Sequence, residues 1–495
     1  MGTYFNIHNH TMYSNIRLLD CINRPKDLID KAIELGLSGI AITDHECISG
    51  HMEVNQYAKE VKKNHPDFKI ALGNEVYLVD TRENGIKYYH FILVAKDAIG
   101  HKALRELSSI AWYYAYVDRG MKRVPITKEE MSKIVTKYKG HLIATSACLG
   151  GELSTAAWNM SQAERVNDMA TAKIHYDQIC EFIDYCRDLF GDDFYIECAP
   201  SSAAQQCEVN KKLMRIAKAY GINMVVGTDS HYLTKEDRFV HKSYLNSKDG
   251  EREVDDFYEF AYLMSPEECR ALLLKSFNDI DIDDIFAATL EAQNKIEDYS
   301  LERKQIIPKV QVPFYDNLWD LLPEEMQWSS YTWPTLDRII CAGNDQERYW
   351  LGECLKSMKE KGFIDKKEYW DRLETEADVI DDIGGKLEDC LFAYFNTFKH
   401  YIDLFWDCGS IVGPGRGSAT GFLSNYLLGI TQLDPVRWKL PYWRFLNKER
   451  AELPDIDIDL APSKRPEIFR RIRQERGELG LIQVGTFGTE GTKSA

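Results

Sequence analysis

Short apolar runs alternate with helical segments over the first 232 residues, and this alternation constrains the fold more than any other feature. The runs that favour β-strands cover 3–9, 39–43, 70–77, 88–95, 141–146, 194–199 and 223–228. Helices are expected near 25–36, 50–64, 97–118, 127–139, 161–190 and 203–220, and C-cap glycines follow three of them (Gly36, Gly140 and Gly221). Strands and helices in alternation predict an α/β barrel or a parallel sheet.

Side chains with metal-ligand chemistry lie at or near the ends of these strands. They are His8, His10, Asp20, Asp44, His45, Glu75, His90, Cys148, Glu197, Asp229 and His231. The spacing of two between the first pair of histidines places both imidazoles on one face of a strand. Because α/β barrels carry their active sites at one end of the strands, we expect these side chains to converge.

Imidazole, carboxylate and thiolate ligands together suit Zn, Mn or Fe, whereas Ca or Mg would favour oxygen ligands alone. Each residue taken singly has a simpler explanation: a lone histidine is often a hydrogen-bonded scaffold residue, and Cys148 a small buried apolar one. Glu197 and Asp44 could orient ligands instead of binding metal. The set as a whole predicts a multinuclear metal centre.

A glycine-rich loop follows in the second half, where residues 409–431 read GSIVGPGRGSATGFLSNYLLGIT. Gly413, Gly415 and Gly417 allow a sharp turn and a close approach to an anion. A helix is expected to start at Ser418, with an apolar stripe of Ala419, Phe422, Leu423, Tyr426 and Leu427. A helix N-terminus with Arg416 beside it predicts a phosphate site, although a glycine loop alone is often only a turn. The residue directly before Ser418 is Gly417 and not Lys, so the loop does not match the P-loop motif.

Three aspartates alternate with apolar residues in the segment LPDIDIDL at 453–460. On a strand, Asp455, Asp457 and Asp459 would share one face while Ile456, Ile458 and Leu460 enter the core. Like charges at this spacing repel unless cations lie between them. The alternative is a solvated edge strand that uses charge against aggregation. Beside a phosphate loop, the pattern favours two-metal nucleotidyl transfer.

The motifs HNH, TDH, GNE, YYHFILVA, CLGGEL and TDSHYL resemble those of the polymerase and histidinol phosphatase (PHP) domain. The resemblance implies a distorted (β/α)7 barrel with a trinuclear centre of Zn, or of Mn or Fe, that hydrolyses phosphoesters. The ligands that it implies are His8, His10, Asp20, His45, Glu75, His90, Cys148, Asp229 and His231. All nine positions carry residue types able to bind metal.

The segments IVGPGRGSATGFLSNYLLGIT, RFLNKERAELPDIDIDL and QVGTFGTEGTKSA resemble the palm of the bacterial C-family replicative DNA polymerase, the DNA polymerase III alpha subunit. The resemblance implies a partial nucleotidyltransferase palm of the polymerase-beta type. In it Asp455 and Asp457 would be catalytic and hold two Mg ions, with Asp459 secondary. Nucleotide phosphates would contact Gly417 and Ser418, and further contacts would come from Arg416, Arg444 and Arg450.

The expected domains are a PHP phosphoesterase at 1–265, an incomplete palm with a helical insertion at 266–486, and the start of a thumb or a continuation at 487–495. Expected partners are primer–template DNA, deoxynucleoside triphosphates and a second polypeptide that supplies the fingers and the rest of the palm. A sliding clamp would bind through that missing half. No Asp follows Asp459, where the family has a third catalytic carboxylate, so we expect a split or truncated polymerase.

Two other functions remain open at this stage: a stand-alone phosphoesterase or 3′→5′ exonuclease, and a non-catalytic replication scaffold. Composition excludes several further classes. An apolar fraction of 44% without a long apolar run excludes a membrane span and disorder. The 12 cysteines show no repeated CxxC spacing, which favours a reducing, cytoplasmic location. A formal charge of −17 argues against a protein that merely coats nucleic acid.

Overall fold

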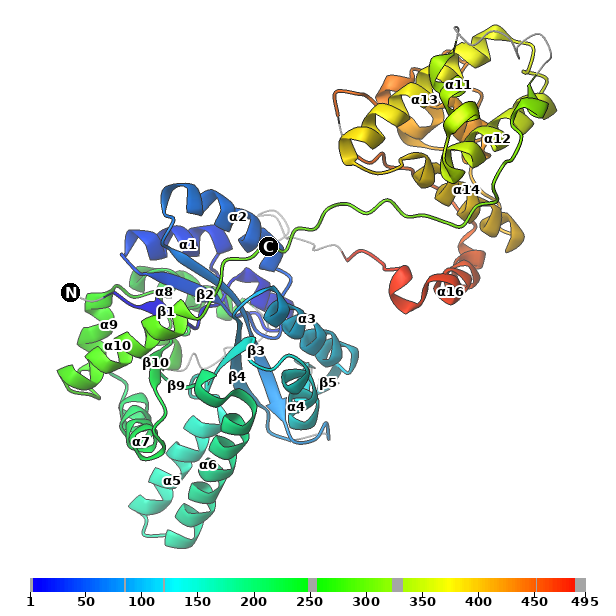
Figure 1. Ribbon diagram of the computed structural model, residues 1–495. Helices are drawn as coiled ribbons and strands as arrows, with labels where there is room; N and C mark the ends of the chain where they lie inside the picture. The colour runs from blue at the N-terminus through cyan, green and yellow to red at the C-terminus, as the bar shows by residue number, and fades with distance from the viewer. Residues whose placement is uncertain are drawn as a thin grey trace. The chain divides into compact units, whose positions relative to one another are not determined.

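The structure is a computed structural model that describes residues 3–83, 86–118, 121–247, 256–322, 333–450 and 452–485. The chain forms two compact units, Met1–Arg303 and Lys304–Ala495 (Figure 1). The expected segment at 487–495 lies outside the described residues. No helix within the described ranges is long and apolar enough to cross a bilayer.

A curved sheet forms the centre of the first unit, with strands in the order β1-β2-β3-β4-β8-β9-β10. These strands are β1 (Phe5–Asn6), β2 (Gly39–Ile42), β3 (Lys69–Val79), β4 (Tyr89–Ala95), β8 (Leu142–Thr145), β9 (Phe194–Cys198) and β10 (Met224–Val226). A parallel bridge between Asn9 and Ser230 joins the two edges. The α/β barrel prediction is therefore confirmed, because all seven expected strands form and the sheet nearly closes on itself.

One strand runs against the others. β4 pairs antiparallel with both β3 and β8, whereas the remaining neighbours in the ring are parallel. An all-parallel sheet is therefore the wrong alternative. The reversal places His90, near the start of β4, at the same rim as the ends of the parallel strands.

Ten helices surround or extend this barrel among the described residues. They are α1 (Pro25–Glu34), α2 (His51–Asn64), α3 (Ala98–Tyr113), α4 (Lys128–Lys137), α5 (Glu152–Arg165), α6 (Met169–Phe190), α7 (Ala204–Tyr220), α8 (Arg238–Leu245), α9 (Pro266–Leu273) and α10 (Asp279–Asn294). The last two extend the unit past residue 265, because Cys269, Ile282 and Phe286 are buried in the barrel's main apolar cluster.

Two predicted helices differ from the structure. The helix expected at 161–190 is two helices, α5 and α6, separated at Asn167 with φ of 57° and capped anew by Asp168, which accepts a hydrogen bond from the N–H of Thr171. The helix expected at 97–118 ends at Tyr113, and β5 (Tyr116–Asp118) pairs with β6 (Met121–Arg123) in a separate ribbon. A further short strand, β7 (Pro125–Thr127), pairs with β3.

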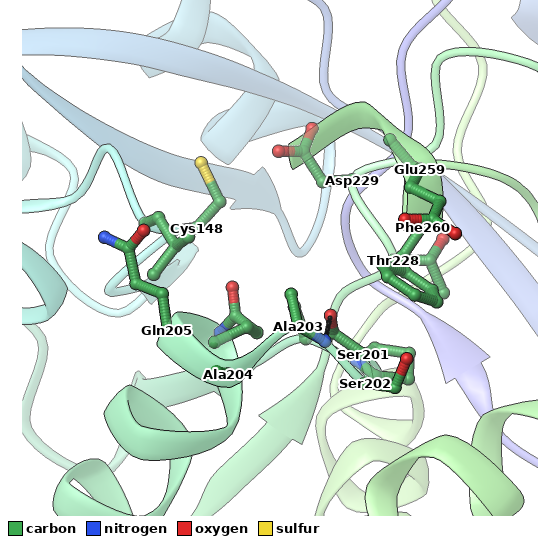
Figure 2. Close-up of a pocket in the computed structure, with 15 residues that line it drawn as sticks. Cys148, Ser201, Ser202, Ala203, Ala204, Gln205, Thr228, Asp229, Glu259 and Phe260 are labelled. Atoms are coloured by element: carbon green, nitrogen blue, oxygen red, sulfur yellow. Dashed lines mark hydrogen bonds between the residues drawn. The ribbon is translucent and has the colours of Figure 1, made fainter. Parts of the chain in front are cut away.

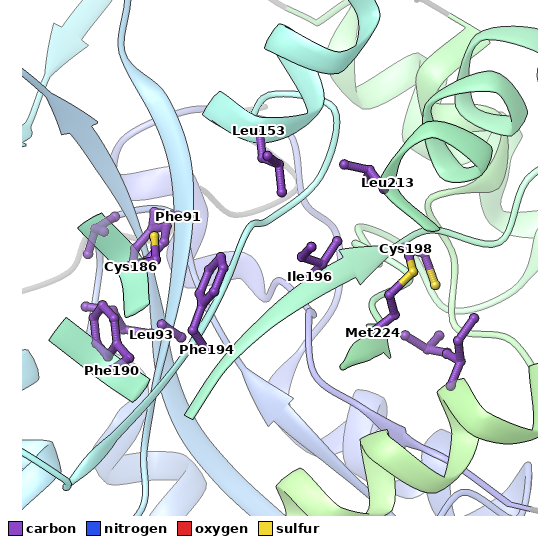
Figure 3. Packing of buried hydrophobic residues seen from close by; sticks show 14 of the residues in the cluster. Phe91, Leu93, Leu153, Cys186, Phe190, Phe194, Ile196, Cys198, Leu213 and Met224 are labelled. Atoms are coloured by element: carbon purple, nitrogen blue, oxygen red, sulfur yellow. The ribbon is translucent and has the colours of Figure 1, made fainter. Parts of the chain in front are cut away.

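Alternate side chains of β4 enter different apolar clusters, as a strand covered on both faces requires. Phe91 and Leu93 pack under the helices with Phe190 of α6 and Phe194 of β9 (Figure 3). Ile92 and Val94 belong to a second cluster and share the face of His90. The rigid core therefore lies directly beneath the rim that carries the candidate ligands.

The second unit is mainly helical. Its helices are α11 (Pro334–Ala342), α12 (Asp345–Glu360), α13 (Lys367–Leu387), α14 (Phe392–Asp407), α15 (Leu423–Leu427) and α16 (Arg465–Arg476). Trp350 and Trp370 are fully buried in its apolar core. Phe422 stacks on Phe395 of α14 with ring centroids 6.0 Å apart, which anchors the glycine loop to the helices.

Among the described residues of 409–460, β-pairing is limited to one antiparallel bridge between Val412 and Leu460. The predicted strand at 453–460 is therefore wrong for the described residues, since a strand needs a continuous partner for its backbone groups. The predicted alternation does appear in burial. Ile456 is 8% exposed, whereas Asp455 and Asp457 on either side of it are exposed.

Candidate metal centre and nucleotide-binding loop

The barrel rim gathers all nine side chains predicted as metal ligands. Eight of them are buried and His90 is half-buried. Three groups have ligand atoms within 4.8 Å of one another: His10, His45 and His231; His8, His10 and Glu75; and Glu75, His90 and Cys148. Because Glu75 and His10 each belong to two groups, the three sets form one continuous cluster.

Glu75 of β3 links ligands from three other segments of the rim. Its carboxylate lies 2.7 Å from Nδ1 of His90, 3.5 Å from Nε2 of His8, and in close contact with Nδ1 of His45. Cys148 joins this side of the cluster, with its Sγ 3.6 Å from Nδ1 of His90. The sulfur, nitrogen and oxygen donors thus face one small volume.

The two aspartates lie on the other side of the cluster. Oδ1 of Asp229 lies 3.0 Å from Nε2 of His10, and Oδ2 of Asp20 lies 2.9 Å from Nε2 of His45. Nε2 of His231 is 3.4 Å from that of His45. Asp229 adopts a φ of 50°, in the left-handed region, so the backbone there is held by its surroundings and not by its own preference.

Two residues fix the orientation of the first histidine pair. Nδ1 of His8 contacts the carboxylate of Glu197 at 2.7 Å, and Nδ1 of His10 contacts the hydroxyl of Ser14 at 3.1 Å. When both Nδ1 atoms carry the proton, both Nε2 atoms present lone pairs to the same volume, where they lie 3.0 Å apart. Glu197 therefore acts as an orienting carboxylate, one of the two roles that the sequence leaves open. The role of Ser14 could not be predicted from sequence.

Asp44 takes the orienting role as well. Its carboxylate accepts hydrogen bonds from the N–H of Thr11 at 2.6 Å and from the hydroxyl of Ser14 at 2.7 Å. These contacts occupy its oxygens and fix the loop that carries His10. The sequence feature that indicates this role is the T-D-H triplet at 43–45, in which the histidine faces the cluster and the aspartate fixes the loop.

The electrostatics of the cluster couple its imidazoles to its carboxylates. Burial lowers the pKa of His45, but the charges of Asp20 and Glu75 outweigh burial and raise that pKa to about 10, so metal binding there would displace a proton. Burial, together with the charges of His45 and His231, lowers the pKa of His10 to about 3, so this imidazole is neutral near pH 7. Burial alone would raise the pKa of Asp20, but the charges of His45 and His231 hold it well below its usual range. Neutral imidazole and ionised carboxylate are the forms that bind metals.

The residues present fit a group of transition-metal ions. Oδ1 of Asp20 is buried and has no hydrogen-bond partner among the described residues, a costly state for a carboxylate oxygen unless a cation binds it. Opposed imidazole nitrogens likewise leave lone pairs without protons between them. The mixture of nitrogen, oxygen and sulfur donors suits Zn, Mn or Fe.

A cavity of about 760 Å³ opens beside this centre (Figure 2). Cys148 and Asp229 lie in its wall, together with residues 199–206 and 259–261. A small molecule or one end of a polymer can therefore reach the metal-ligand side chains from this side.

In the second unit, the glycine loop and the aspartate segment face one another. Nη2 of Arg416 lies 3.3 Å from the carboxylate of Asp457, and Nε lies 3.8 Å from that of Asp459. The backbone N–H of Gly413 donates a hydrogen bond to the carbonyl oxygen of Asp459 at 2.9 Å. The two motifs, distant in sequence, thus meet as the predicted phosphate and metal sites require.

The helix expected to begin at Ser418 is different in the structure. Gly417–Gly421 form a short 3₁₀ helix, η6, and α15 starts only at Leu423. The buried carboxylate of Glu376 accepts hydrogen bonds from the N–H groups of Leu423 and Ser424 at 2.6 and 2.8 Å. The N-terminus of α15 is therefore closed to phosphate, and this part of the prediction is wrong.

The residues predicted to contact nucleotide phosphates are accessible to solvent. Arg416, Gly417, Arg444 and Arg450 are exposed, and Ser418 is half-buried. Arg444 ends a second 3₁₀ helix, η7 (Tyr442–Arg444), which packs against η6. Asp455 is exposed, and it follows Pro454, whose carbonyl oxygen accepts a hydrogen bond from the buried Tyr394 hydroxyl.

Comparison with known families follows this two-part organisation. The PHP domain model matches residues 6–201, and the bacterial DNA polymerase III alpha NTPase domain model matches residues 346–495. The chain thus combines a region similar to the PHP domain with a region similar to the DNA polymerase III alpha NTPase domain. The predicted resemblance is confirmed for both halves.

Several proteins named as DNA polymerases align along nearly all of this chain. A probable DNA polymerase of Bacillus subtilis and a DNA-directed DNA polymerase of Bacillus phage SPbeta are each 39% identical over 99% of this chain and 39% of their own length. The DNA polymerase III alpha subunit of Campylobacter jejuni is 29% identical over 99% of this chain and 38% of its own. The chain thus spans about two fifths of the length of these curated relatives.

The solved structure of an amidohydrolase from Chromobacterium violaceum is only distantly similar to this chain. It aligns with 46% of this chain and 88% of its own at 13% identity and a TM-score of 0.27. At this distance it says nothing about activity.

Proposed function

We propose that the barrel unit is a metal-dependent phosphoesterase that removes nucleotides from the 3′ end of single-stranded DNA. The observation that carries this proposal is the convergence of nine ligand-type side chains beside an open cavity. Cys148 and Asp229 would present metal to a substrate in that cavity. The direction of cleavage follows from the proposed role beside a polymerase, where a 3′→5′ exonuclease would act on the primer end.

The chain's own residues would hold the ions and fix their geometry. His8 and His10 would bind through Nε2, since Glu197 and Ser14 hold their Nδ1 atoms. Glu75 would hold metal together with the rim histidines, because its carboxylate faces three of them. Bound metal lowers the pKa of a water molecule and so supplies a nucleophile at neutral pH. Hydrolysis would form a bond between the oxygen of water and phosphorus and would break the P–O bond to the 3′ oxygen, which would take up the proton that the water loses.

The test is hydrolysis of a 5′-labelled single-stranded oligonucleotide in the presence of Zn or Mn. We expect products shortened from the 3′ end, and loss of at least about 100-fold in rate in His10→Ala and Asp229→Asn. His65→Ala is the matched control, because His65 is exposed at the end of α2. Equal hydrolysis by wild type and both site variants would refute the proposal and indicate a contaminating nuclease.

We infer further that the second unit supplies part of the active site for template-directed DNA synthesis. Asp455 and Asp457 would hold two Mg ions, with Asp459 secondary, while Gly417, Ser418 and Arg416 would contact the triphosphate. The support is the 3.3 Å contact between Arg416 and Asp457, which joins the two motifs. Arg444 and Arg450 would add positive charge for the phosphates.

We propose that DNA synthesis needs residues that correspond to the further length of the relatives. The relatives named as polymerases are more than twice as long as the region matched here. We propose that primer–template DNA and deoxynucleoside triphosphates bind only when further polypeptide supplies the fingers and the rest of the palm. A sliding clamp would be reached through that further polypeptide.

A further inference from the structure

Two arginines and two tyrosines gather beside the candidate metal centre. Arg17 directly follows η1 (Met12–Ile16), Arg123 ends β6, Tyr77 belongs to β3, and Tyr88 directly precedes β4. We call these four residues the arginine–tyrosine cluster. The ring of Tyr77 meets that of His90 edge-on, with centroids 5.0 Å apart, so the cluster adjoins the metal-ligand side chains.

Arg17 is a half-buried cation without a carboxylate partner. Its guanidinium carbon lies 3.6 Å from the centroid of the Tyr77 ring, and its Nη1 donates a hydrogen bond to the hydroxyl of that tyrosine at 2.7 Å. Within the described ranges its Nε is buried without a hydrogen-bond acceptor, and the side chain forms no ion pair. A guanidinium cannot lose its proton, so a buried N–H of this kind is costly unless a ligand supplies the acceptor.

Arg123 brings a second positive charge to the same place. Its Nη1 donates a hydrogen bond to the hydroxyl of Tyr88 at 2.6 Å, and the guanidinium carbons of Arg123 and Arg17 lie 4.8 and 5.5 Å from the centroid of that ring. Asp118 is a weak partner, since its Oδ2 lies 3.8 Å from Nε of Arg123. Two like charges beside one ring repel each other, and a bound anion would remove that repulsion.

An exposed aromatic surface continues from the cluster along the β5–β6 ribbon. Tyr116 of β5 pairs in register with Arg123, and Tyr113 and Tyr114 come just before it in the chain. Tyr113 is 81% exposed, whereas the guanidinium of Arg82 lies over the ring of Tyr114 at 4.5 Å. Cationic groups next to an open aromatic ring are typical of surfaces that bind single-stranded nucleic acid, because phosphates pair with the cations and bases stack on the ring.

We propose that the arginine–tyrosine cluster binds the phosphodiester backbone of a single strand, while Tyr113 stacks on a base, so that the strand enters the metal centre beside His90. This inference rests on the proposed phosphoesterase function and names the part of the substrate that is held outside the reacting phosphate. The planar fork of an arginine suits this role, since it donates two parallel hydrogen bonds to one phosphate. Such a site selects a strand of several nucleotides over a small phosphodiester.

Binding of the strand can be measured apart from its hydrolysis. A fluorescein-labelled oligothymidylate with hydrolysis-resistant phosphorothioate linkages is titrated with the purified chain at several salt concentrations, and Kd is read from fluorescence anisotropy. We expect Arg17→Met and Arg123→Met each to weaken binding about tenfold and to reduce the slope of log Kd against log salt by about 0.7, the value for one phosphate contact in a single strand. Tyr113→Ala should weaken binding about as much and leave the slope unchanged, because stacking releases no counterions.

Arg215→Met is the matched control for this measurement, because Arg215 is an exposed arginine of α7 (Ala204–Tyr220). It should bind the strand as wild type does. Unchanged Kd and slope in both arginine variants of the cluster would overturn the proposal. Equal displacement of the oligothymidylate by poly-glutamate would assign the cluster to acidic peptides and would also overturn it.

Hydrolysis separates strand binding from a role in folding. We compare kcat/KM for an oligothymidylate with kcat/KM for bis(p-nitrophenyl) phosphate, a small diester that has no strand. The ratio of the two should fall about tenfold in Arg123→Met, through KM for the oligonucleotide, and Arg17→Lys should recover part of what Arg17→Met loses. A purely structural role would lower both values alike, and an unchanged ratio would refute the strand-binding site alone. Weakened binding in the variants, with no hydrolysis of either substrate by wild type, would refute the phosphoesterase function alone.

Discussion

Nδ1 of His8 lies 2.7 Å from the carboxylate of Glu197, and both side chains are buried at the barrel rim. Because this contact leaves Nε2 of His8 directed at the other predicted ligands, Glu197 would orient a ligand of the proposed metal centre without being one of the nine predicted ligands. Loss of an orienting partner of this kind costs about 10- to 100-fold in metal affinity.

We therefore predict that Glu197→Gln binds metal about 10- to 100-fold more weakly than wild type, while His8→Ala loses an ion outright. Competition with a chelator, followed by elemental analysis, measures both effects. Glu291→Gln is the matched control, since Glu291 lies on the exposed side of α10. Unchanged metal content in Glu197→Gln would mean that the contact with His8 only supports the fold.

A second prediction concerns acid stability. Nδ1 of His51 lies 3.0 Å from Nε2 of His101 in the barrel unit. Burial and the neighbouring charge of His101 lower the pKa of His51 to about 3, and burial with Arg105 lowers that of His101 to about 4. In the unfolded chain both histidines bind protons below a pH of about 6.5, whereas in the folded chain burial keeps them neutral to a lower pH. The free energy of unfolding therefore keeps this contribution above pH of about 6.5 and loses it as the pH drops towards 4.

Urea unfolding at several pH values tests this, with an expected loss of up to about 1.4 kcal/mol per pH unit for each histidine. The double variant His51→Gln, His101→Gln should show a shallower dependence than wild type. His65→Gln, an exposed control, should keep the wild-type slope. Identical slopes in wild type and the double variant would contradict the assignment.

A third prediction concerns the glycine loop. Glu376 is fully buried, accepts the N–H groups of Leu423 and Ser424, and pairs with Nε of Arg372 at 2.7 Å. Glu376→Ala leaves these donors without a partner and should destabilise the second unit by about 3–5 kcal/mol. Denaturant unfolding measures the change. Glu368→Ala, at an exposed position of the same helix, should have little effect.

The fourth prediction is that this chain alone does not extend a primer. Asp455 and Asp457 are exposed on an extended segment that forms no continuous strand among the described residues, so we expect their carboxylates not to be fixed for two ions about 4 Å apart. Extension should appear when the further polypeptide is added, and Asp457→Asn should abolish it. Robust extension by the chain alone would refute the proposed incomplete site.

Much of the barrel could be predicted from sequence, because strand and helix periodicities are local. His8, Glu75 and Asp229 were identified through their positions at strand ends, and the barrel topology brings them together. The direction of β4 was not predictable in this way, since the run 88–95 has the same apolar pattern in either direction. Nor was the role of Ser14, which depends on contacts across the fold.

The second unit was less predictable. The glycines and Ser418 have the local signature of a loop followed by a helix start. The cap that closes α15 comes from Glu376, which lies on α13 and leaves no signal near the loop. The alternation of Ile456 with its flanking aspartates predicted burial correctly, but not hydrogen bonding, because a strand also depends on a partner.

The reversed direction of β4 has a consequence for protein engineering. Glu75 and His90 lie on neighbouring strands of one hairpin, and the ladder that pairs Tyr77 with His90 sets their relative position. The length of the connection between the strands does not affect this relative position. A tag or a fluorescent reporter inserted in that connection should leave both ligands aligned, whereas an insertion of one residue within either strand would turn a ligand to the opposite face of the sheet.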